Sequence, residues 1–249
     1  KAIDAYEFCV AIDEKFEIAY RNMAEAYIRL KWYDKAIESL EKNLELGKPE
    51  DVIFEAIGHC FEKKKNLPKA RHYYVEAIKL NPTDDGIYYK IGQTYVQEHN
   101  WDKALKQFAK AYELNKENVN YCLALGDCLL QLNDGPEALA CYISAIKIRP
   151  NYKKSWLSLI KALYLFGYYE EAATQIKESA NFFEPSADFI YYEALILFAK
   201  GKSKEAMLKL EDAIEDAPRK IKIIEELQPE LLQRNAVIDL ISKYKKTKK

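Results

Sequence analysis

The chain has 249 residues, and its 38 basic and 39 acidic side chains give no basic field that would favour nucleic acid or an anionic membrane as a partner. Hydrophobic residues make up 49% of the chain and charged residues 31%, which excludes an intrinsically disordered polymer. Only 8 Gly and 8 Pro occur, too few for the closely spaced turns of an all-β protein.

A fixed period runs through the sequence, and the equally spaced Gly58, Gly92 and Gly126 follow it. When units of this length are numbered from Glu17, position 20 is alanine in all six units: Ala36, Ala70, Ala104, Ala138, Ala172 and Ala206. A period of about 34 residues indicates a stack of similar supersecondary units, each of which buries its apolar face against its neighbours.

Each unit is predicted to be a helix hairpin. Apolar residues recur at positions 4, 7, 8 and 11, and again at 20, 24, 27 and 28, spacings that define one face of each of two helices. Pro68 and Pro136 stand at position 18, where proline suits the first turn of the second helix, and Asp134 is placed to cap that helix.

This pattern resembles the tetratricopeptide repeat (TPR) family. The third unit carries the family's signature residues at positions 4, 7, 8, 11, 20, 24 and 27: Tyr88, Ile91, Gly92, Tyr95, Ala104, Phe108 and Ala111. The resemblance implies an all-α, right-handed superhelical solenoid of antiparallel helix hairpins. Because the signature residues pack the helices against one another, they are specific for the fold and say little about function.

In chain order, residues 1–16 are expected to be the second helix of a truncated repeat, since Ala2, Tyr6 and Cys9 match positions 20, 24 and 27. Six repeats are then expected at 17–50, 51–84, 85–118, 119–152, 153–186 and 187–220. The chain starts inside a helix without Met, so we expect it to be a fragment of a longer protein.

Residues 221–249 are expected to form C-terminal capping helices and a basic tail. Ile221, Ile224, Leu227 and Leu231 keep helical spacing, as a helix that covers the last apolar face of an array requires. Pro229 is expected to start a new helix, with a break near Asn235. The lysines of the tail, Lys243, Lys245, Lys246, Lys248 and Lys249, are interpreted as a solvated terminus.

Two residues depart from the family pattern. Ile160 occupies position 8 of the fifth repeat, where Gly or Ala is usual, and Glu193 occupies position 7 of the sixth, a core position. Neighbouring residues are expected to shift to accommodate them, and the alternative is a local opening that exposes Glu193 for a contact.

The sequence contains no recognisable catalytic or metal-binding constellation. Its five cysteines form no CxxC pair, its three histidines have no partners at ligand spacing, and motifs for nucleotide binding or hydrolysis are absent. Cys60 and Cys128 stand at a packing position, so we interpret them as core residues. The sequence therefore predicts no enzyme activity, no cofactor and no metal. No apolar run reaches the length of a membrane span.

What remains is a binding surface implied by the resemblance, because the family presents positions 2, 5, 9, 12 and 13 of each first helix to a concave groove. The predicted groove residues are Tyr89, Gln93, Leu123, Asp127, Leu157, Lys161, Tyr164, Tyr191, Leu195 and Phe198. Tyr191, Leu195, Leu157 and Lys161 are expected to form a pocket for an apolar anchor followed by an acidic residue. One alternative is that curvature buries these side chains. Another is that the binding surface lies elsewhere, on the charged wall around Arg21 and Glu55.

The predicted function is that of a non-catalytic scaffold that binds a protein or peptide segment in its groove. The alternatives are a regulatory or substrate-recruiting arm of an enzyme whose catalytic domain lies upstream, and a self-association module. No nucleic acid is expected as a partner, and no pattern indicates a homo-oligomer. The sequence does not define the compartment, and the cytoplasm is favoured.

Overall fold

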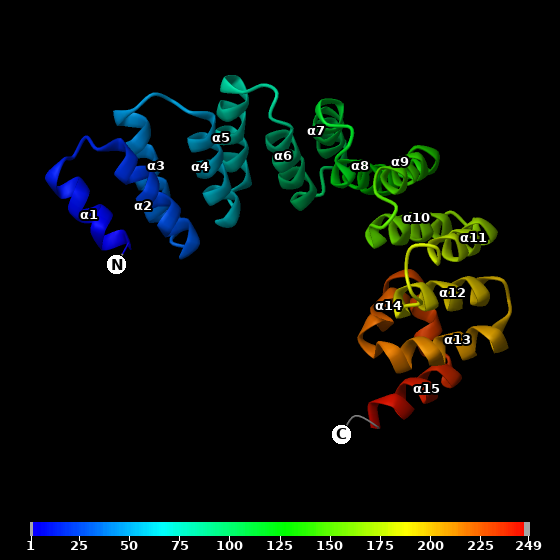
Figure 1. Cartoon of the computed structure of the whole chain (residues 1–249). Helices are drawn as coiled ribbons and strands as arrows, with labels where there is room; N and C mark the ends of the chain where they lie inside the picture. The colour runs from blue at the N-terminus through cyan, green and yellow to red at the C-terminus, as the bar shows by residue number, and fades with distance from the viewer. Residues whose placement is uncertain (1, 247–249) are drawn as a thin grey trace. The chain divides into compact units, whose positions relative to one another are not determined.

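The computed structural model describes residues 2–246, and within this range the chain forms helices and turns without a strand (Figure 1). The predicted all-α array of antiparallel hairpins is confirmed. The α-helices and 3₁₀ helices (η) are α1 (Ala2–Ile12), α2 (Glu17–Arg29), α3 (Tyr33–Leu46), α4 (Asp51–Lys63), α5 (Leu67–Leu80), α6 (Asp85–Gln97), α7 (Trp101–Leu114), α8 (Val119–Gln131), α9 (Gly135–Ile148), α10 (Lys153–Leu165), α11 (Tyr169–Ser179), α12 (Ala187–Ala199), α13 (Ser203–Asp216), η1 (Pro218–Ile221), α14 (Lys222–Leu227), η2 (Pro229–Gln233) and α15 (Asn235–Lys246).

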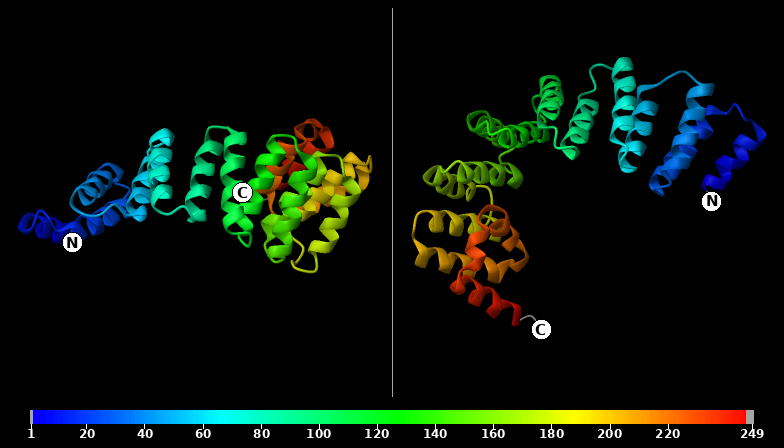
Figure 2. Two further views of the ribbon diagram at one scale, coloured as in Figure 1. Left: turned by 90° about the horizontal axis from the view of Figure 1, so that it is seen from above. Right: turned by 180° about the vertical axis from the view of Figure 1, so that it is seen from behind.

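The helices belong to two compact units, Lys1–Lys116 and Glu117–Lys249. The first unit holds α1 and the hairpins α2–α3, α4–α5 and α6–α7, while the second holds α8–α9, α10–α11, α12–α13 and the C-terminal helices. Within each unit, the second helix of one hairpin packs on the first helix of the next, as α3 does on α4 and α9 on α10 (Figure 2).

The turn inside each hairpin has the same backbone conformation. Position 15 is left-handed in every repeat, with φ between 56° and 79°, at Lys31, Lys65, His99, Asn133, Gly167 and Gly201. The next amide then donates back to the first helix, as Trp32 N does to Tyr27 O at 2.9 Å. This arrangement ends the first helix and reverses the chain.

The second helices begin with side-chain caps in three repeats. Asn66, Asn100 and Asp134 all stand at position 16, and each accepts a hydrogen bond from the backbone amide three residues later. These caps satisfy amides that have no partner within the helix. The predicted cap at Asp134 is confirmed.

The two helices of a hairpin cross where a small residue at position 8 faces a large one at position 24. A Cβ added at Gly58 would lie 2.6 Å from the Tyr74 ring, and one added at Gly126 would lie 2.6 Å from the Tyr142 ring. Glycine is therefore required at these crossings by the close approach of an aromatic ring.

The two departures from the pattern are accommodated differently. Ile160 is fully buried, and its extra volume is matched by Ile176, which stands at position 24 where the three preceding repeats have an aromatic residue. The Glu193 carboxylate lies at the surface, where it pairs with Lys209 of α13 at 3.0 Å. The structure thus shows Glu193 in a contact outside the core, and that contact is intramolecular.

After α13 the regular hairpins give way to short pieces of helix. Gln228 precedes proline and has φ −152°, outside the helical range, so α14 ends at Leu227 and η2 begins at Pro229. The helices η1 and α14 pack on α12, and α15 packs on α13. Of the predicted basic tail, Lys243 pairs with Glu211 at 2.6 Å, and the lysines at 245, 246, 248 and 249 lie outside the described side chains.

Candidate functional site

The candidate binding surface of the second unit is the side of the first helices that carries positions 2, 5, 9 and 12 of each repeat. We call it the first-helix face. On α10 and α12 it consists of Lys154, Leu157, Lys161, Tyr164, Asp188, Tyr191, Leu195 and Phe198. Helical spacing places these side chains on one side of each helix.

The chain's own residues 217–234, which we call the C-terminal segment, lie against this face. At its start, the Tyr191 hydroxyl donates to the carbonyl oxygen of Ala217 at 3.2 Å. Lys220 then pairs with Asp188 at 2.6 Å, and Lys153 of α10 pairs with the same carboxylate at 2.8 Å. Burial alone would raise the pKa of Asp188, but the hydrogen bonds from Lys153 and Lys220 outweigh it and hold this pKa below its ordinary value.

Further along, the C-terminal segment reaches the preceding hairpin. Glu226 forms an ion pair with Lys161 of α10, and the Tyr164 hydroxyl donates to Gln228 Oε1 at 3.0 Å. The Arg234 guanidinium stands 5.6 Å from the centre of the Phe198 ring. The segment is thus held at positions 2, 5 and 12 of α12 and at positions 9 and 12 of α10.

Apolar burial accompanies these polar contacts. Ile224 and Leu231 of the C-terminal segment are fully buried, and on α12 Tyr191 and Leu195 are also fully buried. Full burial of a side chain such as Ile or Leu contributes roughly 1.5–3 kcal/mol relative to exposure. Burial raises the pKa of Tyr164 to about 12, so its hydroxyl stays protonated and remains a donor at neutral pH.

The predicted open pocket at Tyr191, Leu195, Leu157 and Lys161 is therefore wrong in one respect. Tyr191 and Leu195 are core residues with no exposed surface, because the C-terminal segment covers α12. Leu157 and Lys161 remain half-buried at its edge. The spacing of Ile221, Ile224 and Leu231 predicted a capping helix, but no sequence signal showed that it would extend to α10.

The remaining predicted residues of the second unit lie in two environments. Tyr164 and Phe198 are buried at 7% exposure, and Leu123 of α8 is buried at 1%. Asp127, on the next turn of α8, is exposed and accepts a hydrogen bond from the Tyr142 hydroxyl at 2.8 Å. That bond links the core of the α8–α9 hairpin to a carboxylate on its surface.

In the first unit, the corresponding face is polar. Gln93 of α6 is exposed, whereas Tyr89 is half-buried with its ring 5.3 Å from that of Phe108. Lys90 forms an ion pair with Glu55 of α4. This face offers charged and amide groups, with fewer apolar side chains than the face of α10 and α12.

Burial shifts the pKa values of three cysteine thiols and of one histidine among the described residues. Burial raises the pKa of Cys60 and Cys141 to about 11 and that of Cys128 to about 12, so these thiols stay protonated and poorly nucleophilic at neutral pH. Burial lowers the pKa of His59, and the nearby charge of Lys63 adds to this effect. No group of His, Cys, Asp and Glu side chains within residues 2–246 could hold a metal ion.

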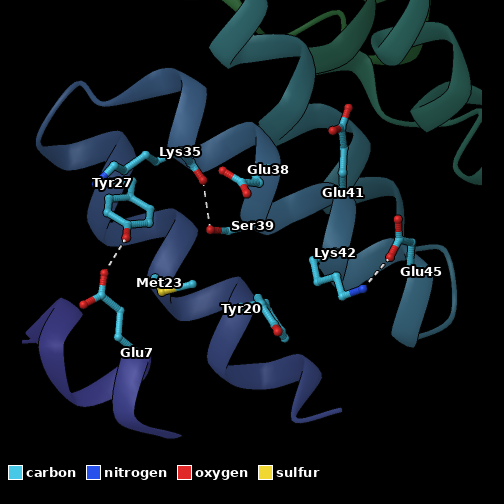
Figure 3. Close-up of a pocket in the computed structure, with 10 residues that line it drawn as sticks. All are labelled: Glu7, Tyr20, Met23, Tyr27, Lys35, Glu38, Ser39, Glu41, Lys42 and Glu45. Carbon is cyan, nitrogen blue, oxygen red and sulfur yellow. Dashed lines mark hydrogen bonds and ion pairs between the residues drawn. The ribbon is translucent and has the colours of Figure 1, made fainter. Parts of the chain in front are cut away.

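A cavity of about 630 Å³ lies between α1, α2 and α3 (Figure 3). It is lined by Glu7, Tyr20, Met23, Tyr27, Lys35, Glu38, Ser39, Glu41, Lys42 and Glu45. The Tyr27 hydroxyl donates to Glu7 at 3.1 Å, and Lys42 pairs with Glu45 at 2.8 Å. Tyr20, Met23 and Tyr27 of this lining stand at signature positions 4, 7 and 11, whereas its other side chains lie outside the repeat signature. The repeat pattern therefore did not predict the cavity.

Comparison with known families agrees with the fold described above. Tetratricopeptide repeat models match residues 95–160 and residues 19–46 and 53–84. The chain belongs to the tetratricopeptide repeat family, whose members are generally non-catalytic scaffolds for protein partners. A search of curated protein sequences gives no significant match.

Several solved structures share this fold. The C-terminal part of a TPR repeat-containing protein from Cytophaga hutchinsonii is 18% identical, with a TM-score of 0.72 over 96% of this chain and 93% of that one. YrrB, described as a TPR protein with an unusual peptide-binding site, is 18% identical, with a TM-score of 0.61 over 80% of this chain and 99% of that one. MamA is 21% identical, with a TM-score of 0.57 over 61% and 89%. These similarities establish the architecture.

Each helix within residues 2–246 is too short or too polar to cross a bilayer.

Proposed function

We propose that the chain binds a segment of a partner protein along the first-helix faces of its repeats and catalyses no reaction. The observation that carries this proposal is the docked C-terminal segment. Ion pairs, a tyrosine hydrogen bond and two buried aliphatic side chains hold a stretch of polypeptide on α10 and α12. A face with this combination of contacts is suited to a peptide ligand.

The same face continues beyond the C-terminal segment on α8 and α10. Asp127 and Lys154 are exposed there, and Leu157 is half-buried between charged neighbours. Asp188, which holds Lys220, stands at position 2 of its repeat, and Lys154 is the residue at that position one repeat earlier. A ligand with acidic groups spaced around an apolar side chain would complement Lys154, Leu157 and Lys161.

The proposal includes the predicted groove residues of the first unit, Tyr89 and Gln93, which lie on a separate, polar first-helix face. The repeat boundaries also stand as proposals, with residues 1–16 as a lone second helix, 17–220 as six repeats and 221–249 as the C-terminal cap. The first helices begin at residues 17, 51, 85, 119, 153 and 187, which supports this division.

A peptide-display selection on the purified chain tests the proposal. Peptides recovered with the wild-type chain should lose at least tenfold in affinity, equivalent to about 1.4 kcal/mol, when Lys154→Glu reverses a charge on the face of α10. The matched control is Lys147→Glu, an exposed charge reversal on the second helix α9. It should change the affinity less than twofold.

Equal losses from both substitutions would show that binding depends on general charge instead of the first-helix face. A loss confined to Lys147→Glu would place the binding site on the second helices. Either result contradicts the proposal, provided that circular dichroism shows both variants to be as helical as the wild type.

A further inference from the structure

Few side chains of the C-terminal segment are fully buried. Ile224 and Leu231 are its fully buried side chains, while Lys222, Glu225 and Glu230 are exposed. Its other contacts with the repeats include the polar ones with Asp188, Lys161, Tyr164 and Tyr191 and the placement of the Arg234 guanidinium against the Phe198 ring. Contacts of this kind can be replaced one for one by a second polypeptide that carries similar groups.

The C-terminal segment also has little structure of its own. Its helices η1, α14 and η2 contain four, six and five residues, and Gln228 and Pro229 separate the last two. Isolated helices of this length are not stable in water, so the face that binds them is what keeps them folded. The segment therefore resembles a bound peptide ligand more than another hairpin of the array.

The order of its contacts defines a chemical pattern. A buried aliphatic residue, Ile224, is followed two positions later by Glu226, which pairs with Lys161. Two positions further, Gln228 accepts the hydrogen bond of Tyr164. An apolar anchor, an acid and an amide at alternate positions thus match the face of α10 and α12.

We propose that the C-terminal segment is an exchangeable occupant of this face, and that a partner segment with the same apolar–acid–amide pattern displaces it. This inference rests on the proposed function and adds its regulation and its ligand chemistry. A tethered occupant acts at an effective concentration of about a millimolar, so it lowers the apparent affinity for the partner by the fraction of chains in which it is docked. Any change that loosens the segment raises that affinity.

The test uses a fluorescently labelled peptide with the sequence of residues 217–234, added to the full chain. In the chain variant Glu226→Lys, the tethered segment loses its ion pair and meets Lys161 with a like charge. This variant should bind the labelled wild-type peptide at least tenfold more tightly than the wild-type chain does. The matched control is Glu225→Lys, because Glu225 is the exposed neighbour in the same helix, and it should stay within twofold of wild type.

A second pair of measurements separates specific exchange from general loosening. The chain variant Lys161→Glu should prefer the peptide that carries Glu226→Lys over the wild-type peptide, because the charges on face and ligand are then exchanged. Helicity measured by circular dichroism confirms that each variant is folded. If Glu226→Lys does not fold, the Lys161→Glu chain still decides the question.

Folded variants that bind the peptide no better than the wild type would show that the C-terminal segment is a permanent cap, and would overturn the inference. Light scattering that shows dimers of the Glu226→Lys chain without peptide would also overturn it, since the occupant would then be a second copy. If displayed peptides bind the face but do not compete with the labelled peptide, this inference is wrong and the proposed function stands. If the Glu226→Lys chain binds the labelled peptide as expected but the display selection recovers no binder, the proposed function is wrong and this inference stands.

Discussion

At the scale of single residues, the size of position 8 is matched to the size of position 24. Gly92 faces Phe108, and Gly58 and Gly126 face tyrosines, whereas Ala24 and Ala194 stand opposite Leu40 and Leu210 in the first and last repeats. Each hairpin therefore closes with a different pair of side chains that fills a similar space. Dense packing makes such paired volumes interdependent.

Gly92→Ala should destabilise the chain by roughly 1–3 kcal/mol through overpacking, because its Cβ would lie 2.6 Å from Cδ1 and 2.9 Å from Cζ of Phe108. Urea denaturation measures this loss. The control is Gly86→Ala on the same helix, whose Cβ would lie 3.2 Å from Asp84 Oδ1 and would meet no ring. Adding Phe108→Leu to Gly92→Ala reproduces the alanine–leucine pair of the first repeat and should recover part of the stability.

The burial of α12 leads to a second prediction at this scale. Leu195 has no exposed surface, so Leu195→Ala should cost about 2–5 kcal/mol in the free energy of unfolding. Leu208→Ala on α13 is the matched control, since Leu208 is 65% exposed and its truncation should cost less than about 0.5 kcal/mol. Similar melting temperatures for the two variants would show that the C-terminal segment does not cover α12.

At the scale of helices, the turn between the two helices of a hairpin is strained in the repeats that have no glycine at position 15. Position 15 is left-handed in all six repeats, yet Lys31 and Lys65 occupy it where Gly167 and Gly201 suit it better. A left-handed conformation costs a residue with a Cβ about 1–2 kcal/mol, while glycine costs roughly 0.5–1 kcal/mol in chain entropy. The repeats with Lys31 and Lys65 at position 15 are therefore less stable than they would be with glycine there.

Lys31→Gly should raise the free energy of unfolding by up to about 1 kcal/mol, because it removes the left-handed strain at small entropic cost. Thermal denaturation measures the gain. The reverse change, Gly201→Ala at the same position of the sixth repeat, should lower stability by a similar amount. If Lys31→Gly leaves the free energy of unfolding unchanged, this turn is not left-handed in solution.

The docking of the C-terminal segment depends on pH through Asp188. Its folded-state pKa lies below its ordinary value of 3.8, so the carboxylate contributes stability that is fully present above about pH 4 and is lost as pH falls through the folded value. Asp188→Asn should therefore destabilise the chain at pH 7, by about 1–2 kcal/mol for a charged hydrogen-bonded pair, and the difference should shrink at pH 3. Exposed Asp212→Asn provides the control for urea denaturation at both pH values. A difference that stays constant between pH 7 and pH 3 would contradict this assignment.

At the scale of the whole molecule, the hairpin array could be predicted from the sequence, because its signal is local and repeated. Alanine at position 20 and glycine at position 8 report contacts inside one hairpin, and such contacts recur once in every repeat. Pro229 likewise predicted a helix start, because proline acts on its own backbone. The candidate site was harder to predict, because the exposure of Tyr191 and Leu195 depends on a segment that follows only after all of α13, and its packing direction is not encoded in any repeat signature.

In the whole molecule, the C-terminal segment lies on the first-helix face of α10 and α12. Zero-length carbodiimide cross-linking of monomeric chain, followed by mass spectrometry, tests it directly, because such a link forms only between an amine and a carboxylate in contact. The structure predicts a link between Lys161 and Glu226, alongside the internal reference link between Lys209 and Glu193 of α12–α13. Isotope-labelled and unlabelled chains mixed before the reaction should show the Lys161–Glu226 link within single chains. Formation of the reference link without the Lys161–Glu226 link would contradict the account.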